Sequence, residues 1–264
     1  MKLAVKIIFV DIDWTILDHS EGKRRFDIDS INYLREAQKE GIKVVVCTAR
    51  PYHSVKQVGL FDVFAPDALI CANGALVLAG EEIVHKDVFD KVKFEELCEL
   101  VISLGLTMEA TLAFDRFLIA PETEYVSKLY TTYYEDTPEV MDYHNQEIIT
   151  AMLFAPEEYD AQMLANLPEG VSYFRFDTYG VDIFDIPHYK GNGVKIVLDY
   201  YGFTKDDAIA FGDDLGDVSM FEEVKYGFAM ANGKPELLEK AYSIIPPVYE
   251  EGIKKAFVEY KIGK

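Results

Sequence analysis

Continuous apolar runs alternate with amphipathic segments along the first 80 residues of the chain. The runs have strand length and a continuous apolar centre, as expected for strands covered on both faces: VKIIFVDI at 5–12, IKVVVCTAR at 42–50 and DALICANGA at 67–75. Between the first two, residues 29–41 carry apolar side chains at helical spacing, with Asp29 as the predicted N-cap and Gly41 as the predicted end. A short helix is predicted over 52–61. This alternation predicts βαβ units and a parallel sheet with right-handed crossovers.

The pattern changes after about residue 82 and returns near residue 186. The intervening stretch has a helical segment at 94–105 and strand-like segments rich in aromatics, at 115–121, 149–156 and 171–186. Beyond it come a helix at 191–204, a strand at 207–217, a helix at 218–225 and a short strand at 226–230. We therefore expect a doubly wound, Rossmann-like α/β core formed by residues 1–81 and 186–264, with an α+β cap inserted at 82–185.

The composition narrows the choice of partners. The net charge of −20 argues against nucleic acids and anionic membranes as partners, and no apolar run approaches the roughly 20 residues of a membrane span. Residues 82–185 hold 22 Asp and Glu residues against 6 Lys and Arg, which sets the predicted cap apart from the core. The three cysteines lie in apolar segments, as expected for reduced thiols in the cytoplasm. The oligomeric state cannot be read from the sequence.

Polar side chains follow each predicted core strand. They are Asp11, Asp13 and Thr15 after the first strand, Thr48 and Arg50 after the second, Asn73 after the third, and Asp213, Asp214 and Asp217 after the fourth. Lys190, which precedes the helix at 191–204, can reach the same place. Because ligands bind at the carboxyl ends of strands in an open parallel sheet, we expect these groups to form one site.

The residue types at these strand ends favour phosphoryl chemistry. Clustered carboxylates repel one another unless a cation holds them, and ligand sets made only of oxygen select a hard ion such as Mg²⁺. Thr48 and Lys190 suit the oxygens of a phosphate. A carboxylate in line with a phosphate can attack it, and a second one can protonate the leaving oxygen. Asp11 and Asp13 have suitable spacing, because residues i and i+2 of an extended strand face the same way.

The ordered motifs resemble those of the haloacid dehalogenase superfamily. DIDWTILD looks like its first motif, VVVCTAR its second, YKGNGV its third and AFGDDLGD its fourth. CANGA and FAMANG stand where Cof-type hydrolases carry similar segments, and the stretch 82–185 matches the large α/β cap of that subfamily. The resemblance extends over the whole chain. A single motif of this kind is weak, whereas the ordered set is specific.

The resemblance implies a role for each matching residue. Asp11 is the implied nucleophile and Asp13 the implied general acid and base, while Thr48 and Lys190 bind the phosphoryl group. Mg²⁺ is implied as cofactor, held by Asp11, the backbone carbonyl of Asp13 and Asp213, with Asp217 supporting the metal site. Weaker candidates for substrate binding are Arg50, Asn73 and Asn232.

Three positions depart from the family pattern. Trp14 and Ala49 stand where glycine is usual, and Gly216 replaces the usual asparagine of the fourth motif. The few cations of the cap include Arg116 and Arg175, and we expect one of them to bind a polar substrate, with a surface ion pair as the alternative.

The implied function is that of a Mg²⁺-dependent phosphatase. Its substrate is expected to be a small phosphorylated metabolite, such as a sugar phosphate, that reacts through an aspartyl phosphate. Two alternatives stay open: a phosphotransferase or mutase of the same fold, and a phospho-ligand sensor whose catalysis has decayed.

Overall fold

The computed structural model describes residues 3–22, 24–133 and 136–263, which form two compact units. Unit 1 comprises Met1–Arg50, Gly59–His85 and Tyr189–Lys264, and unit 2 comprises Pro51–Val58 and Lys86–His188. Both ends of the chain therefore contribute to unit 1. The division predicted at residues 82 and 185 stays a prediction.

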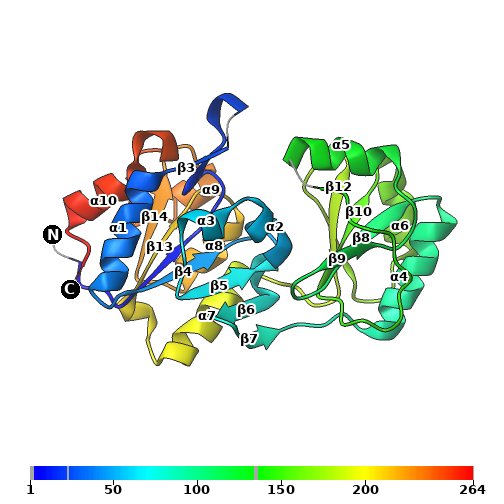
Figure 1. Ribbon diagram of the computed structural model, residues 1–264, viewed down its shortest axis with the longest axis horizontal. Coiled ribbons are helices and arrows are strands. Elements are labelled where there is room, and N and C mark those ends of the chain that lie inside the picture. Colours follow the sequence, from blue (N-terminus) through cyan, green and yellow to red (C-terminus); the bar gives the residue numbers. More distant parts are fainter. Residues whose placement is uncertain (1–2, 23, 134–135, 264) are drawn as a thin grey trace. The chain divides into compact units, whose positions relative to one another are not determined.

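Unit 1 is built on an eight-stranded sheet (Figure 1). In spatial order its strands are β15 (Ser243–Ile245), β14 (Tyr226–Met230), β13 (Ala208–Gly212), β1 (Ile7–Val10), β4 (Lys43–Cys47), β5 (Ala68–Cys71), β6 (Leu76–Ala79) and β7 (Glu82–Lys86). The six strands from β15 to β5 run parallel, whereas β6 pairs antiparallel with β5. The predicted doubly wound α/β core is thus confirmed, with an antiparallel edge that the sequence pattern did not indicate.

Helices cover both faces of this sheet, which explains why its central strands are apolar throughout. On β1, Ile7 and Phe9 belong to the core cluster under α7 (Lys190–Tyr201) and α8 (Gly216–Glu222), and Ile8 and Val10 are equally buried on the opposite side. That side carries α1 (Ile28–Lys39), which packs on β4 and against α10 (Gly252–Tyr260). Each side chain of β1 therefore lies in an apolar layer.

The remaining elements of unit 1 are short. They are β2 (Leu17–Asp18) and β3 (Arg25–Phe26), which form a hairpin, α3 (Leu60–Val63), α9 (Pro235–Leu238), and the 3₁₀ turns η1 (Ser20–Gly22), η2 (Ala72–Gly74), η4 (Lys205–Asp207) and η5 (Val248–Glu250). The predicted N-cap of α1 was wrong. Asp27 caps the helix by accepting a hydrogen bond from the Ser30 N–H, so Asp29 lies in the first turn and pairs with Lys254.

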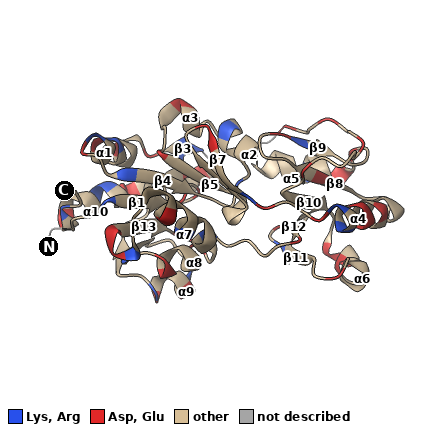
Figure 2. Cartoon of the chain, turned by 90° about the horizontal axis from the view of Figure 1, so that it is seen from below, with Lys and Arg blue, Asp and Glu red and all other residues tan. Residues whose placement is uncertain are grey.

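Unit 2 contains a five-stranded antiparallel sheet. In spatial order its strands are β11 (Ser172–Arg175), β12 (Gly180–Phe184), β10 (Thr150–Phe154), β8 (Thr107–Thr111) and β9 (Arg116–Leu118). Its helices are α2 (Tyr52–Gln57), α4 (Lys91–Ser103), α5 (Glu124–Tyr133) and α6 (Asp160–Asn166), with the 3₁₀ turn η3 (Glu157–Tyr159). Apolar residues of α4 and α6 form one cluster with the sheet, and those of α5 form a second with Leu118 and Phe154. Acidic residues are spread over the helices and loops of this unit (Figure 2).

The structure offers no candidate for a membrane span: none of the helices in residues 3–22, 24–133 and 136–263 is both long and apolar enough to cross a bilayer.

Candidate active site

Four segments of unit 1 bring their polar residues together where parallel strands end. Asp11 directly follows β1, Thr48 follows β4, and Asp213 follows β13, while Lys190 is the first residue of α7. Since neighbouring parallel strands end at one edge of the sheet, these residues converge without any long loop.

The Lys190 side chain lies at the centre of the cluster and is almost fully buried. Its Nζ lies 2.7 Å from Asp11 Oδ1 and 2.7 Å from Asp217 Oδ1. Burial by itself lowers the pKa of a lysine, but the charges of Asp11 and Asp217 outweigh burial and raise the pKa of Lys190 well above its ordinary value. Lys190 is therefore charged and bridges two carboxylates.

A third buried carboxylate, that of Asp213, completes the cluster. One carboxylate oxygen from each of Asp11, Asp213 and Asp217 lies within 4.8 Å of the other two. Burial raises the pKa of Asp11 to about 7, with Lys190 opposing the rise and Asp217 adding to it. Burial, together with the charges of Asp11 and Asp217, raises the pKa of Asp213 to about 9. Three carboxylates thus face one ammonium group, and two of them resist ionisation.

This donor set fits a divalent cation. All three groups offer oxygen, which hard ions such as Mg²⁺ prefer, and a charge of +2 would balance the two carboxylate charges that Lys190 leaves. Asp217 is already held: its Oδ2 accepts the N–H groups of Asp213 and Asp214 at 2.8 and 3.0 Å. Within the described part of the chain, the Asp213 side chain accepts a single, long hydrogen bond of 3.3 Å, from the Thr15 hydroxyl. Asp11 and Asp213 therefore have the more available oxygens, with Asp217 fixing the loop beside them.

Asp13 lies outside the carboxylate cluster and has its own donors. Its Oδ1 accepts hydrogen bonds from His19 Nε2 at 2.6 Å and from Arg50 Nη2 at 2.7 Å, and its Oδ2 accepts one from Arg50 Nε at 2.7 Å. Burial raises the pKa of Asp13, but the hydrogen bonds from His19 and Arg50 outweigh burial and hold the pKa well below its ordinary value. Asp13 is ionised in this arrangement. Arg50 is thus engaged in an ion pair with Asp13, and substrate binding by Arg50 stays a prediction.

The backbone between Asp11 and Asp18 forms a tight turn. The N–H of Trp14 donates to the Leu17 carbonyl at 2.8 Å, and Trp14 adopts a φ of +56°. Left-handed backbone is uncommon for any residue other than glycine and is strained for a bulky one. Trp14 therefore stands where the family usually has glycine, in a backbone region that glycine adopts without strain.

Thr48 and Asn73 lie at the ends of neighbouring strands of the sheet. The Thr48 side chain is buried, and its hydroxyl accepts a hydrogen bond from the Arg50 N–H at 3.1 Å. The Asn73 N–H donates to the Thr48 carbonyl, and Asn73 has a φ of +55°. A Cβ placed on Gly216 would lie 4.0 Å from Asn73 Oδ1 and 3.8 Å from Lys190 Cε. Asn73 is therefore close to the cluster, beside the glycine that replaces the usual asparagine.

Asn232 occupies an exposed turn after β14. Two residues later, the N–H of Lys234 donates to the Asp213 carbonyl at 2.9 Å, which ties this turn to the cluster. The structure thus brings the Asn232 turn to the site through its backbone.

Arg116 lies in unit 2, and its guanidinium is engaged by other groups. It donates to Glu109 Oε2 at 2.9 Å and to the Asp136 carbonyl at 2.6 Å, and it lies over the ring of Tyr130. Both Arg116 and Glu109 are buried, so this pair is interior rather than superficial. These contacts favour the ion-pair alternative, and substrate binding by Arg116 stays a prediction.

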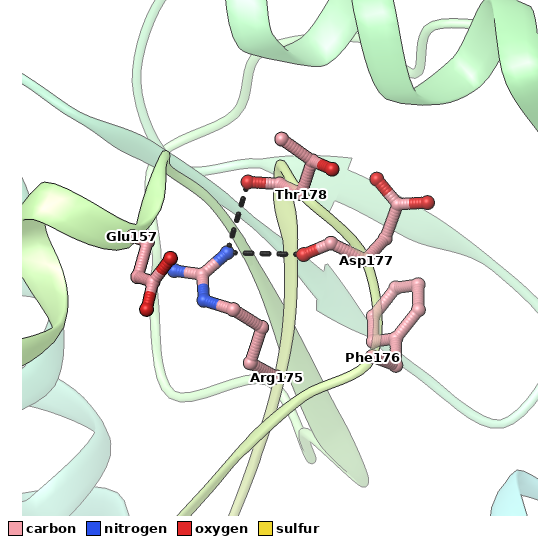
Figure 3. A pocket seen from close by; sticks show the side chains of 5 residues that line it. All are labelled: Glu157, Arg175, Phe176, Asp177 and Thr178. Carbon is pink, nitrogen blue, oxygen red and sulfur yellow. Dashed lines mark hydrogen bonds between the residues drawn. The ribbon is translucent and has the colours of Figure 1, made fainter.

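Arg175 lines a small hollow at the end of β11, and its guanidinium points back into the loop (Figure 3). Nη1 donates to the carbonyls of Ala155, Asp177 and Thr178 at 3.0 to 3.1 Å, and Nε donates to Asp160 Oδ2 at 2.8 Å. Because these bonds hold the loop after β11 closed, the contacts again favour a structural pair.

Sequence reasoning missed His19. No motif contains this residue, and the sequence offered only its position six residues after Asp13 as an indication. Its Nε2 nevertheless makes the shortest of the three hydrogen bonds to Asp13, and its ring lies 5.4 Å from that of Trp14.

Comparison with known proteins is consistent with this site. The sequence profile of the haloacid dehalogenase-like hydrolases matches residues 8–257. The Bacillus subtilis protein YkrA, whose name classes it as a phosphatase, is 30% identical over 271 residues that span 98% of this chain and 99% of YkrA. The phosphoglycolate phosphatase 1 of Saccharolobus solfataricus is 26% identical over 252 residues, 95% of this chain and 93% of that protein.

Solved structures show the same fold. The crystal structure of a hypothetical protein from Geobacillus kaustophilus superposes with a TM-score of 0.89 at 24% identity, covering 97% of this chain and 99% of that one. A sugar phosphatase of haloacid dehalogenase subclass IIB superposes with a TM-score of 0.77 at 23% identity, with the same coverage. Both likenesses extend over nearly the whole chain.

Proposed function

The chain belongs to the haloacid dehalogenase-like hydrolases of the Cof type and is a phosphatase, and we propose that it hydrolyses a small phosphomonoester through a phosphorylated Asp11 with Mg²⁺ as cofactor. One observation carries this proposal: Asp11, Asp213 and Asp217 form a buried cluster around Lys190 at the ends of parallel strands. A nucleophilic carboxylate, a cation that offsets its charge and oxygen ligands for a metal are thereby present together.

In the first step, an oxygen of Asp11 attacks the phosphorus atom and the ester P–O bond breaks. Lys190 stabilises the ionised Asp11 beforehand and the phosphoryl oxygens during transfer, together with the Thr48 hydroxyl. Bound Mg²⁺, held by Asp11, Asp213 and the Asp13 carbonyl, would neutralise charge on the phosphoryl oxygens. The negative charge of the incoming phosphate raises the proton affinity of the Asp13 carboxylate, which takes a proton from the solvent as the substrate binds and then donates it to the leaving oxygen.

In the second step, water attacks the phosphorus of the aspartyl phosphate. The Asp11–phosphorus bond breaks, Asp13 accepts the proton of the attacking water, and inorganic phosphate is released. Asp13 is already ionised in the resting structure, as a base must be. Hydrolysis of 4-nitrophenyl phosphate with and without MgCl₂ tests this function, and the absence of metal-dependent turnover on a broad panel of phosphomonoesters would contradict it.

We assign the choice of substrate to the inserted cap, residues 82–185. Its excess of acidic residues disfavours polyanions, so a small metabolite with one phosphate, such as a sugar phosphate, fits best. Relatives named for phosphoglycolate and sugar phosphates support this size class without selecting one member of it.

We expect the metal-free protein to become less stable as the pH rises from about 5 to about 9. The folded-state pKa values of Asp11, about 7, and of Asp213, about 9, lie above the ordinary value of 3.8, so the folded state binds more protons than the unfolded state across this range. Mg²⁺ binds the ionised carboxylates, so the increase in the melting temperature of the protein on addition of Mg²⁺ should be larger near pH 8 than near pH 5. Differential scanning fluorimetry measures both. An increase that is equal at the two pH values, or one that persists in Asp213→Asn, would contradict the metal site.

We expect Gly216→Asn to strengthen Mg²⁺ binding by about tenfold, because polar groups that orient metal ligands typically contribute 10- to 100-fold in affinity. The substitution fits, since a Cβ at this position meets Lys190 and Asn73 only at ordinary contact distances. Gly216→Ala serves as the control for the added Cβ alone. Titration of MgCl₂ followed by the melting temperature gives the affinity, and equal affinities of the Asn and Ala variants would refute the role of the amide.

A further inference from the structure

The hydrogen bonds to Asp13 leave it one available acceptor position among its described contacts. An ionised carboxylate has about four lone-pair positions, two on each oxygen. His19 Nε2 and Arg50 Nη2 occupy both positions of Oδ1, and Arg50 Nε occupies one position of Oδ2. Because the partner of His19 is an ionised oxygen, Nε2 carries the hydrogen of this bond. The remaining position is therefore on Oδ2.

Trp14 fixes the ring that makes this arrangement possible. The indole of Trp14 and the imidazole of His19 lie 5.4 Å apart, inclined by 50°, and both side chains are partly buried. Trp14 maintains this contact from left-handed backbone, which glycine would adopt without strain. A strained bulky residue beside a reactive group is a common sign of function.

We propose that His19, oriented by Trp14, is a positioning residue that occupies Oδ1 of Asp13 and so directs Oδ2 to take the proton of the attacking water. Arg50 alone holds the plane of the carboxylate but leaves one lone pair on each oxygen, so water could bind at either. With His19 present, only Oδ2 can receive it. The inference rests on the proposed function, in which water attacks phosphorylated Asp11, the Asp11–phosphorus bond breaks, and the proton passes to Asp13.

The step to measure is the decay of the phosphorylated enzyme. After rapid mixing with 4-nitrophenyl phosphate and MgCl₂, acid quenching traps the aspartyl phosphate. We expect His19→Ala to slow its decay by about tenfold, a part of the 10²- to 10⁴-fold contribution of a general base. The rate of formation should stay unchanged, because 4-nitrophenolate leaves without a proton. His19→Gln, which restores a donor near the position of Nε2, should recover most of the decay rate.

Trp14→Gly separates positioning from structural support. Glycine relieves the backbone strain, so the melting temperature should stay the same or rise, while decay slows as in His19→Ala. The double variant should decay no more slowly than His19→Ala, because both changes remove one interaction.

Failure of this inference is distinguishable from failure of the proposed function. If Asp11→Asn or Asp13→Asn retains wild-type turnover, the proposed function fails. If both abolish turnover but His19→Ala shows wild-type decay, His19 has no positioning role and the proposed function stands. Equal slowing of formation and decay in His19→Ala, without recovery in His19→Gln, would show a purely structural role and also overturn the inference.

Discussion

The turnover rate of 4-nitrophenyl phosphate is expected to fall by a factor on the order of 10⁴ or more in Asp11→Asn, because the substitution removes the covalent nucleophile. An amide oxygen carries no negative charge and does not attack phosphorus. The variant keeps the shape of the side chain and an acceptor for Lys190. Release of inorganic phosphate in the presence of MgCl₂ measures the loss, and acid quenching should trap no phosphorylated protein.

The melting temperature of Asp11→Asn shows whether turnover is lost because the nucleophile is absent or because the variant is misfolded. Because burial raises the pKa of Asp11 to about 7, its charge destabilises the metal-free folded state near pH 8, and a neutral amide removes this effect. The metal-free variant should therefore melt at the same temperature as the wild type or higher. Asp214→Asn is the matched control, since Asp214 directly follows Asp213 in sequence but is exposed, and among the described residues its side chain accepts a hydrogen bond from the Leu215 N–H alone. Wild-type turnover in Asp11→Asn, or its loss in Asp214→Asn, would contradict the assignment.

The apolar runs predicted the core of the fold because burial on both faces leaves a clear signal. The segments 5–12 and 42–50 contain β1 and β4, and the helical stripe at 29–41 contains most of α1. In unit 2 the signal was weaker. The strand β8, which reads TMEAT, buries Thr107, Glu109 and Thr111 as fully as its apolar residues, so hydropathy alone did not reveal it.

Within the site, the motifs identified the residues but not their partners. The spacing of Asp11 and Asp13 suggested one shared environment, yet the turn after β1 separates them. Asp11 contacts Lys190, whereas Asp13 contacts Arg50 and His19. Such pairings depend on side-chain positions brought together by the fold, which no local pattern encodes.

Lys190→Met is expected to lose both stability and turnover. The Lys190 ammonium group donates a hydrogen bond to Asp11 and another to Asp217, so both carboxylates share this cation. Methionine has a similar length but no charge, so two buried carboxylates lose their cation. Breaking a buried ion pair in this way typically destabilises a protein by about 3 kcal/mol or more. Loss of phosphoryl stabilisation should lower kcat/KM by about 10³-fold.

The pH dependence of the stability loss in Lys190→Met shows whether Lys190 stabilises the fold through its charge or through packing. Without Lys190 the pKa of Asp11 rises further, so a proton can replace the ammonium group near pH 5 but not near pH 8. The difference in melting temperature between the metal-free wild type and variant should therefore be larger near pH 8. Added MgCl₂ should restore part of the stability without restoring turnover, because a metal ion neutralises the carboxylates but does not replace the ammonium group at the phosphate.

Lys195→Met provides the control on the same helix. Lys195 is 58% exposed and pairs with Glu223 at 3.2 Å, an interaction worth about 1 kcal/mol or less at the surface. This variant should keep the wild-type melting temperature and turnover at both pH values. If Lys190→Met were as stable as Lys195→Met at both pH values, the carboxylates would not depend on Lys190 for their charge. A loss of stability that is equal at the two pH values would instead assign Lys190 to packing.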